Sequence, residues 1–151
     1  MTADQKRLLR ETFALLEGHA SVAPLLFYHR LFTLKPSLRG LFTTDIEAQG
    51  RKLMEALAFI VATFDSPQVQ GQALAALGRR HAAYGVRTED YATVGRALIW
   101  MMEEDLGPVF TAEAREAWEL AYDQIARRMQ GVSEVQTDHP VFPPLTLGKA
   151  H

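Results

Sequence analysis

The stretch Leu74-Ala-Ala-Leu-Gly-Arg-Arg-His-Ala-Ala-Tyr-Gly-Val86 puts one histidine on the apolar face of a predicted helix. That face follows the 3.6-residue helical period and consists of Leu74, Leu77, His81 and Tyr84. A histidine that points inward needs partners for its two ring nitrogens. Two interpretations meet that need: a hydrogen bond to a backbone carbonyl, or coordination of a metal ion.

The composition is that of one folded domain, with 151 residues, 48% hydrophobic and 23% charged residues, and a net charge of −2. This balance gives no reason to expect nucleic acid or an anionic membrane as a partner. The absence of cysteine excludes disulfides, thiolate ligands and iron–sulfur clusters. A charged N-terminal segment and the lack of a long apolar run predict a cytoplasmic protein without a signal peptide or a membrane span.

The chain is predicted to be all-α, because no segment alternates as a strand would. Proline, glycine and capping residues divide it into helices within residues 2–18, 21–35, 46–64, 67–85, 88–106 and 111–131. The expected N-terminal caps are Thr2, Ser21, Thr88 and Thr111. Residues 1–131 are predicted to form the domain, and 132–151 a proline-containing tail.

Three further polar side chains share apolar helical faces: Tyr28, Gln49 and Tyr91. Each tyrosine can be an ordinary core aromatic whose hydroxyl reaches a carbonyl. Gln49 is harder to explain in that way, since a buried amide has four hydrogen-bonding positions to satisfy. A polar ligand inside the helical bundle would account for it, with His81 opposite the other residues.

The remaining charged clusters are interpreted as solvated surface, namely Arg79-Arg80, Arg127-Arg128 and Glu103-Glu104-Asp105. The sequence has no glycine-rich nucleotide loop, no nucleophile elbow and no His-Glu-x-x-His zinc motif. The five histidines show no short spacing suited to zinc.

Taken in order, these residues resemble a bacterial single-domain globin, similar to the haem domain of flavohaemoglobins. The similarity runs from about residue 3 to residue 131 and rests on Tyr28, Phe42 fourteen residues later, Gln49 seven beyond that, and Leu-Gly-Arg-Arg-His81 followed by Tyr91. Pro36 and Trp118 also stand where the family has a turn and its last helix. The resemblance implies the globin fold, a three-over-three helical sandwich around a haem.

The resemblance also implies haem b (iron protoporphyrin IX) with His81 as the iron ligand. One imidazole nitrogen would bind iron while the other N–H bonds the carbonyl of Leu77. Tyr28 and Gln49 would face the sixth coordination position. Haem contacts are expected from Phe42, Leu53, Tyr91 and Val94, while Lys52 and Arg80 are expected near the propionates or as plain solvated charges.

The function implied is reversible binding of dioxygen, and of nitric oxide and carbon monoxide, at ferrous iron. Two hydrogen-bond donors of about 1–1.5 kcal/mol each would tighten dioxygen binding by roughly 30- to 150-fold and slow its release. The alternative is an enzyme, a nitric oxide dioxygenase or a peroxidase-like haem protein, that depends on a separate reductase. A third interpretation, a haem-free signalling module of globin shape, is disfavoured by the set of His81, Phe42, Gln49 and Tyr28.

One feature departs from the flavohaemoglobin pattern. That family pairs its proximal histidine with a tyrosine, matched here by Tyr91, and a glutamate. The glutamate position falls at Ser133, with Glu134 one residue later. The tail does not resemble the start of a reductase domain, so electrons for repeated turnover would come from another protein.

Overall fold

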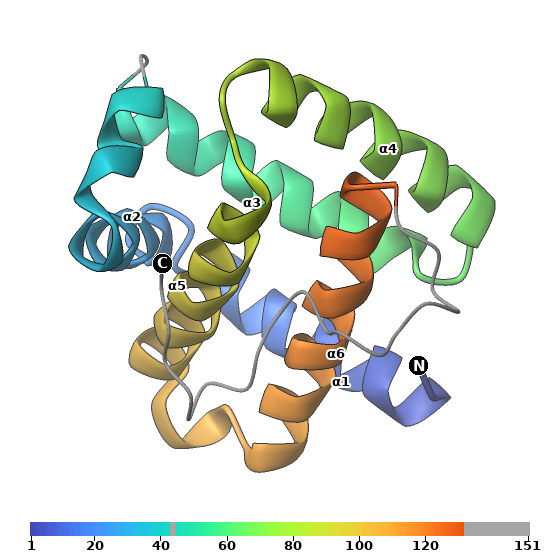
Figure 1. Ribbon diagram of the computed structural model, residues 1–151. Coiled ribbons are helices and arrows are strands. Elements are labelled where there is room, and N and C mark those ends of the chain that lie inside the picture. Colours follow the sequence, from blue (N-terminus) through green and yellow to red (C-terminus); the bar gives the residue numbers. More distant parts are fainter. Residues whose placement is uncertain (43–44, 132–151) are drawn as a thin grey trace.

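The computed structural model describes residues 1–42 and 45–131, and every regular element in these two ranges is a helix (Figure 1). The prediction of an all-α chain is therefore confirmed for this part. The elements are α1 (Ala3–Glu17), α2 (Ala23–Leu34), the 3-10 helix η1 (Pro36–Leu41), α3 (Ile46–Thr63), α4 (Pro67–Ala83), α5 (Thr88–Leu106), the 3-10 helix η2 (Gly107–Val109) and α6 (Ala112–Met129). The tail 132–151 lies outside the described residues.

Two of the four predicted helix caps are confirmed. The Thr2 side chain accepts the Gln5 N–H at 3.0 Å, and Thr111 Oγ1 accepts the Ala114 N–H at 3.1 Å. These side chains satisfy amide groups that have no partner within the helix itself.

The other two predicted caps, Ser21 and Thr88, are wrong. Helix α2 begins at Ala23 because the preceding turn already satisfies its amides, with the Val22 and Ala23 N–H groups bonded to the His19 carbonyl, both at 2.9 Å. Thr88 is the first residue of α5 rather than its cap. The Asp90 carboxylate caps this helix instead, by accepting the Arg87 N–H at 2.8 Å.

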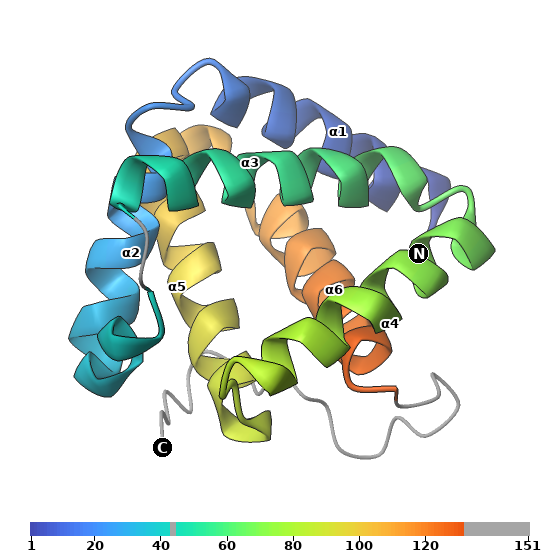
Figure 2. The ribbon, with the colours of Figure 1, turned by 90° about the horizontal axis from the view of Figure 1, so that it is seen from above.

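The helices pack in two layers. Helices α1, α3 and α4 form one layer, and α2, α5 and α6 form the other, as the two views in Figures 1 and 2 show. Helix α6 packs against α1 and α4 across the layers, and α2 packs against α3. This arrangement of three helices over three agrees with the predicted fold.

The core between the layers is mostly apolar, and one of its polar links joins α6 to α1. Trp118 is fully buried on α6, and its indole N–H donates to Thr12 Oγ1 on α1 at 2.7 Å. The Thr12 hydroxyl in turn donates to the Leu8 carbonyl at 2.7 Å, so each of these buried polar groups is satisfied. The largest fully buried apolar side chains are Leu9, Leu16, Leu31, Leu74, Ile99, Met101, Met102 and Trp118.

Several sequence-based expectations of exposure are wrong. Tyr84 does not continue the inward face of its helix but is 71% exposed, since α4 ends at Ala83. Arg127 is only 2% exposed, and its guanidinium bonds Asp123 one turn earlier, at 3.0 Å. The Asp105 side chain is 7% exposed and bonds the His19 ring at 2.8 Å. Arg79 and Arg80 are exposed, as predicted.

A buried ion pair joins the end of α2 to the start of α5. The Lys35 ammonium lies 2.5 Å from Asp90 Oδ1, and the Asp90 side chain is 2% exposed. The other carboxylate oxygen of Asp90 is the one that caps α5. One side chain therefore fixes two elements that are far apart in the sequence.

None of the helices in the described ranges combines the length and the apolar character required to cross a membrane.

Candidate functional site

His81 lies in the last turn of α4 and is half-buried. Its Nδ1 lies 2.9 Å from the Leu77 carbonyl oxygen, one turn earlier. A carbonyl cannot donate, so Nδ1 carries the proton, and this confirms the hydrogen bond expected from the sequence. In the neutral ring Nε2 then keeps its lone pair, and it makes no hydrogen bond to any described residue. An imidazole held in this tautomer is suited to coordinate a metal ion.

The end of α4 that carries His81 is held by a very close helix contact. A Cβ atom added to Gly78 would lie 1.7 Å from the Met129 carbonyl oxygen of α6. The two backbones therefore touch at a position where only glycine fits. The position of His81, three residues further on, depends on this contact, which the sequence analysis did not identify.

Tyr28, Phe42 and Gln49 meet at one corner of the molecule. The Tyr28 hydroxyl on α2 donates to the Gln49 backbone carbonyl on α3 at 3.1 Å. The Tyr28 and Phe42 rings pack edge to face with centroids 5.3 Å apart. Phe32 joins them, with centroids 6.0 Å from Tyr28 and 5.4 Å from Phe42. The aromatic cluster thus joins α2 to the end of η1, and the Tyr28 hydroxyl links it to the backbone of α3.

A second glycine brings α2 and α3 together beside this cluster. A Cβ on Gly50 would come within 2.9 Å of the Pro24 Cβ atom on α2. The small residue lets α3 approach α2 closely enough for the Tyr28 hydroxyl to reach the Gln49 carbonyl. The sequence analysis did not identify Gly50 either, since spacing along one helix does not reveal which helix lies next to it.

Burial controls the protonation of Tyr28. It raises the pKa of the Tyr28 phenol to about 12, because the charged phenolate would lose its hydration. The side chain is therefore a neutral hydrogen-bond donor near pH 7.

Gln49 and His81 lie toward the free ends of a V made by α3 and α4. The two helices share the corner at residues 64–66 and diverge from it, as Figure 2 shows. Gln49 is in the first turn of α3 and His81 in the last turn of α4, both far from that corner. His81 makes no hydrogen bond or ring contact with Tyr28 or Phe42 within the described ranges. The structure brings Tyr28, Phe42 and Gln49 together and leaves His81 on the opposite arm.

The predicted apolar haem contacts are only partly covered by protein. Phe42, Leu53 and Val94 are half-buried and pack on the edge of the core. Lys52 and Arg80 are exposed, and neither forms an ion pair with a described residue. Partly covered apolar side chains beside exposed cations suit a flat apolar group that carries carboxylates, so the chemistry of these residues fits haem.

Tyr91 is buried near the start of α5, and its backbone carbonyl accepts a 2.7 Å hydrogen bond from the Tyr122 hydroxyl of α6. Burial raises the pKa of Tyr91, and it raises that of Tyr122 still further. Tyr122 is a part of this region that the sequence analysis missed. Ser133 and Glu134, considered for the third position of the proximal set, lie outside the described residues.

The chain matches the sequence pattern of the family described as Globin over residues 25–129. The chain is a globin.

This globin is 33% identical over 135 residues to a flavohemoprotein of Bordetella pertussis and 29% identical to one of Rhizobium meliloti, in both cases over 87% of its own length. It spans about a third of the length of these curated relatives, 33% and 34% respectively.

Solved structures agree with the family assignment. An engineered carbene transferase, described as a proposed nitric oxide dioxygenase from Rhodothermus marinus, is 28% identical with a TM-score of 0.77, over 87% of this globin and 92% of that chain. A bacterial globin from Campylobacter jejuni, 20% identical, shares the fold with a TM-score of 0.77 over 91% of this chain and all of its own. Membership of the family supports haem binding by this chain.

Proposed function

We propose that this globin holds haem b through His81 and binds dioxygen, nitric oxide and carbon monoxide reversibly. The observation that carries the proposal is the hydrogen bond from His81 Nδ1 to the Leu77 carbonyl, at 2.9 Å. It fixes the ring tautomer and orientation and leaves Nε2 as the donor atom for iron. Haem, when bound, supplies a ferrous iron with one coordination position open to a diatomic gas.

Tyr28 and Gln49 would stabilise a dioxygen ligand by donating hydrogen bonds. The Tyr28 hydroxyl has a single proton, which it donates to the Gln49 carbonyl at 3.1 Å. Rotation about the C–O bond can redirect that proton to a ligand without moving the ring. The raised pKa of Tyr28, about 12, keeps the proton on the hydroxyl at neutral pH. Tight binding and slow release follow from such donors.

The other predicted contacts have simpler roles. The half-buried side chains of Phe42, Leu53 and Val94 would cover the apolar faces of the porphyrin and exclude water. Lys52 and Arg80 would meet its propionates at the surface.

An absorption spectrum tests the proposal directly. The purified, haem-loaded protein is compared in its ferric, ferrous and oxygen-exposed ferrous states with His81→Ala and with the control His29→Ala, which removes an exposed histidine of α2. We expect a strong Soret band, a five-coordinate ferrous form and a stable oxygen complex. Haem retention should fall on the order of 100-fold in His81→Ala and stay unchanged in His29→Ala. No Soret band after reconstitution, or equal retention in both variants, would refute the assignment.

A second candidate function is nitric oxide dioxygenation with electrons from a separate reductase. It is favoured by the similarity to flavohemoproteins and to the Rhodothermus marinus protein. Oxygen-saturated ferrous protein is mixed with nitric oxide, with and without an added reductase and its reductant. Sustained consumption over many turnovers would support the enzyme, whereas a single turnover that no reductase restores would leave gas binding as the function.

A further inference from the structure

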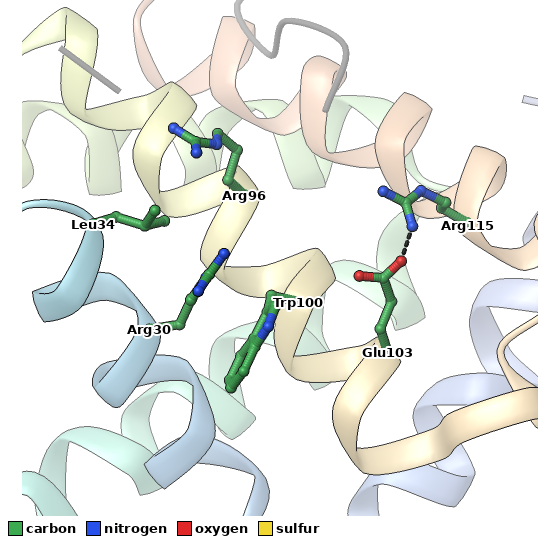
Figure 3. A pocket seen from close by; sticks show the side chains of 6 residues that line it. All are labelled: Arg30, Leu34, Arg96, Trp100, Glu103 and Arg115. Carbon is green, nitrogen blue, oxygen red and sulfur yellow. Dashed lines mark ion pairs between the residues drawn. The ribbon is translucent and has the colours of Figure 1, made fainter. Parts of the chain in front are cut away.

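A pocket between α2, α5 and α6 carries a concentration of positive charge (Figure 3). It contains none of the residues assigned to the haem. Its lining consists of three arginines, one acid and two apolar side chains, namely Arg30, Arg96, Arg115, Glu103, Leu34 and Trp100.

The three arginines differ in how their charges are balanced. Arg115 forms an ion pair with Glu103, drawn in Figure 3, and a second one with Glu119 at 3.3 Å. Arg30 and Arg96 form no ion pair with any residue in the described ranges. At one end of the pocket the positive charge of Arg115 is therefore balanced by acids. At the other end no ion pair with a described residue balances the charges of Arg30 and Arg96.

Arg96 has an unsatisfied hydrogen-bonding group. Its Nη1 atom is buried and has no hydrogen-bond partner among residues 1–42 and 45–131. A buried N–H without an acceptor is unfavourable, and more so when the group is charged. Burial lowers the pKa of Arg96, and the charge of Arg30 lowers it further. The Arg96 guanidinium nevertheless stays protonated near pH 7, because the pKa of arginine starts so high.

Arg30 is held in place by an aromatic ring. Its Cζ atom lies 5.2 Å from the centroid of Trp100, in a cation–π contact, and Leu34 lies at the same end of the pocket. The His29 ring flanks Trp100 with centroids 6.3 Å apart. The guanidinium is thus oriented at the pocket before anything binds, which reduces the entropy lost on binding.

We propose that Arg30 and Arg96 form a binding site for a small oxyanion, a phosphate or a carboxylate. An oxyanion has several acceptor oxygens and can take hydrogen bonds from two guanidinium forks at once. It would accept hydrogen bonds from the two guanidinium groups and reduce the repulsion between the two cations. The site lies on α2 and α5 and is independent of the proposed haem ligand on α4.

Isothermal titration calorimetry on the full, haem-loaded chain tests the site. Inorganic phosphate and succinate are titrated separately at neutral pH, with sodium chloride at equal ionic strength as the reference. We expect saturable binding with a Kd on the order of 1 mM or below for at least one of them. The tighter of the two anions identifies the ligand class.

Three variants that each remove one positive charge show where the anion binds. Arg30→Gln and Arg96→Gln should each weaken binding by about tenfold or more, while Arg10→Gln, an exposed arginine on α1, should leave it unchanged. Because both arginines are half-buried, circular dichroism checks the folding of each variant. The proposal is overturned if neither anion binds better than chloride up to about 10 mM. It is equally overturned if all three variants titrate alike.

Discussion

On one side of the candidate site, the Tyr28 side chain contacts both the Phe42 ring and the Gln49 backbone carbonyl, and these residues come from three elements. On the other side, the His81 ring is bonded to its own helix, and that helix is positioned by backbone contact at Gly78. The first arrangement depends on side chains and can be weakened one group at a time. The second depends on how closely two backbones approach, so a single methyl group can disturb all of it.

The largest expected effect comes from a methyl group at the α4–α6 contact. Gly78→Ala should lower the free energy of unfolding by about 3 kcal/mol, because the Met129 carbonyl cannot move away without shifting α6. Gly71→Ala is the matched control in the same helix, where an added Cβ meets nothing within 4 Å. It should instead raise stability by about 0.5–1 kcal/mol. Urea denaturation measures both, and similar values for the two variants would contradict the close contact.

The side-chain arrangement is tested next, through oxygen release. Tyr28→Phe combined with Gln49→Leu should speed oxygen dissociation by roughly 30- to 150-fold, and Tyr28→Phe alone by about tenfold. Stopped-flow displacement by carbon monoxide measures the rates.

The control for this prediction is Tyr122→Phe. It removes a similar hydroxyl–carbonyl bond, to Tyr91, on a different pair of helices. It should lower stability by about 1 kcal/mol and change oxygen release by less than about threefold. If Tyr122→Phe accelerated release as much as Tyr28→Phe, the proposed role of Tyr28 as a donor to the ligand would be wrong.

The smallest effect concerns pH. The pKa of Tyr28 is about 12 in the folded protein and near 10 when unfolded, so the unfolded chain loses this proton first. Stability from Tyr28 is therefore complete below pH 10 and declines as the pH rises toward 12. The stability difference between wild type and Tyr28→Phe should shrink by about 1 kcal/mol from pH 10 to pH 11. A difference that stays constant over this range would mean that the phenol titrates normally.

Much of this molecule could be predicted from local chemistry. Thr2, Pro36 and Gly107 mark helix ends because capping and backbone restriction act over a few residues. The His81–Leu77 bond was predictable for the same reason, since it spans a single turn.

Features that depend on contact between distant helices could not be predicted in that way. Nothing in the sequence around Gly78 indicates that Met129 lies against it. The arginine pocket could not be predicted for the same reason, because it is lined by residues from three helices. Helix α5 begins at Thr88, one residue earlier than a Thr88 cap would place it, and the Asp90 carboxylate accepts the Arg87 N–H, so even a local prediction can be displaced by one residue.

The ion pair between Lys35 and Asp90 has a topological consequence. It joins two points 55 residues apart, and the chain between them carries Phe42, Gln49, Leu53 and His81. The ion pair closes this segment into a non-covalent loop. The loop contains α3 and α4, whereas α1, α5 and α6 lie outside it. Closing a loop of that size restricts its freedom to open. We expect the segment to open as one cooperative unit, with α1, α5 and α6 still folded, so that haem loss precedes global unfolding.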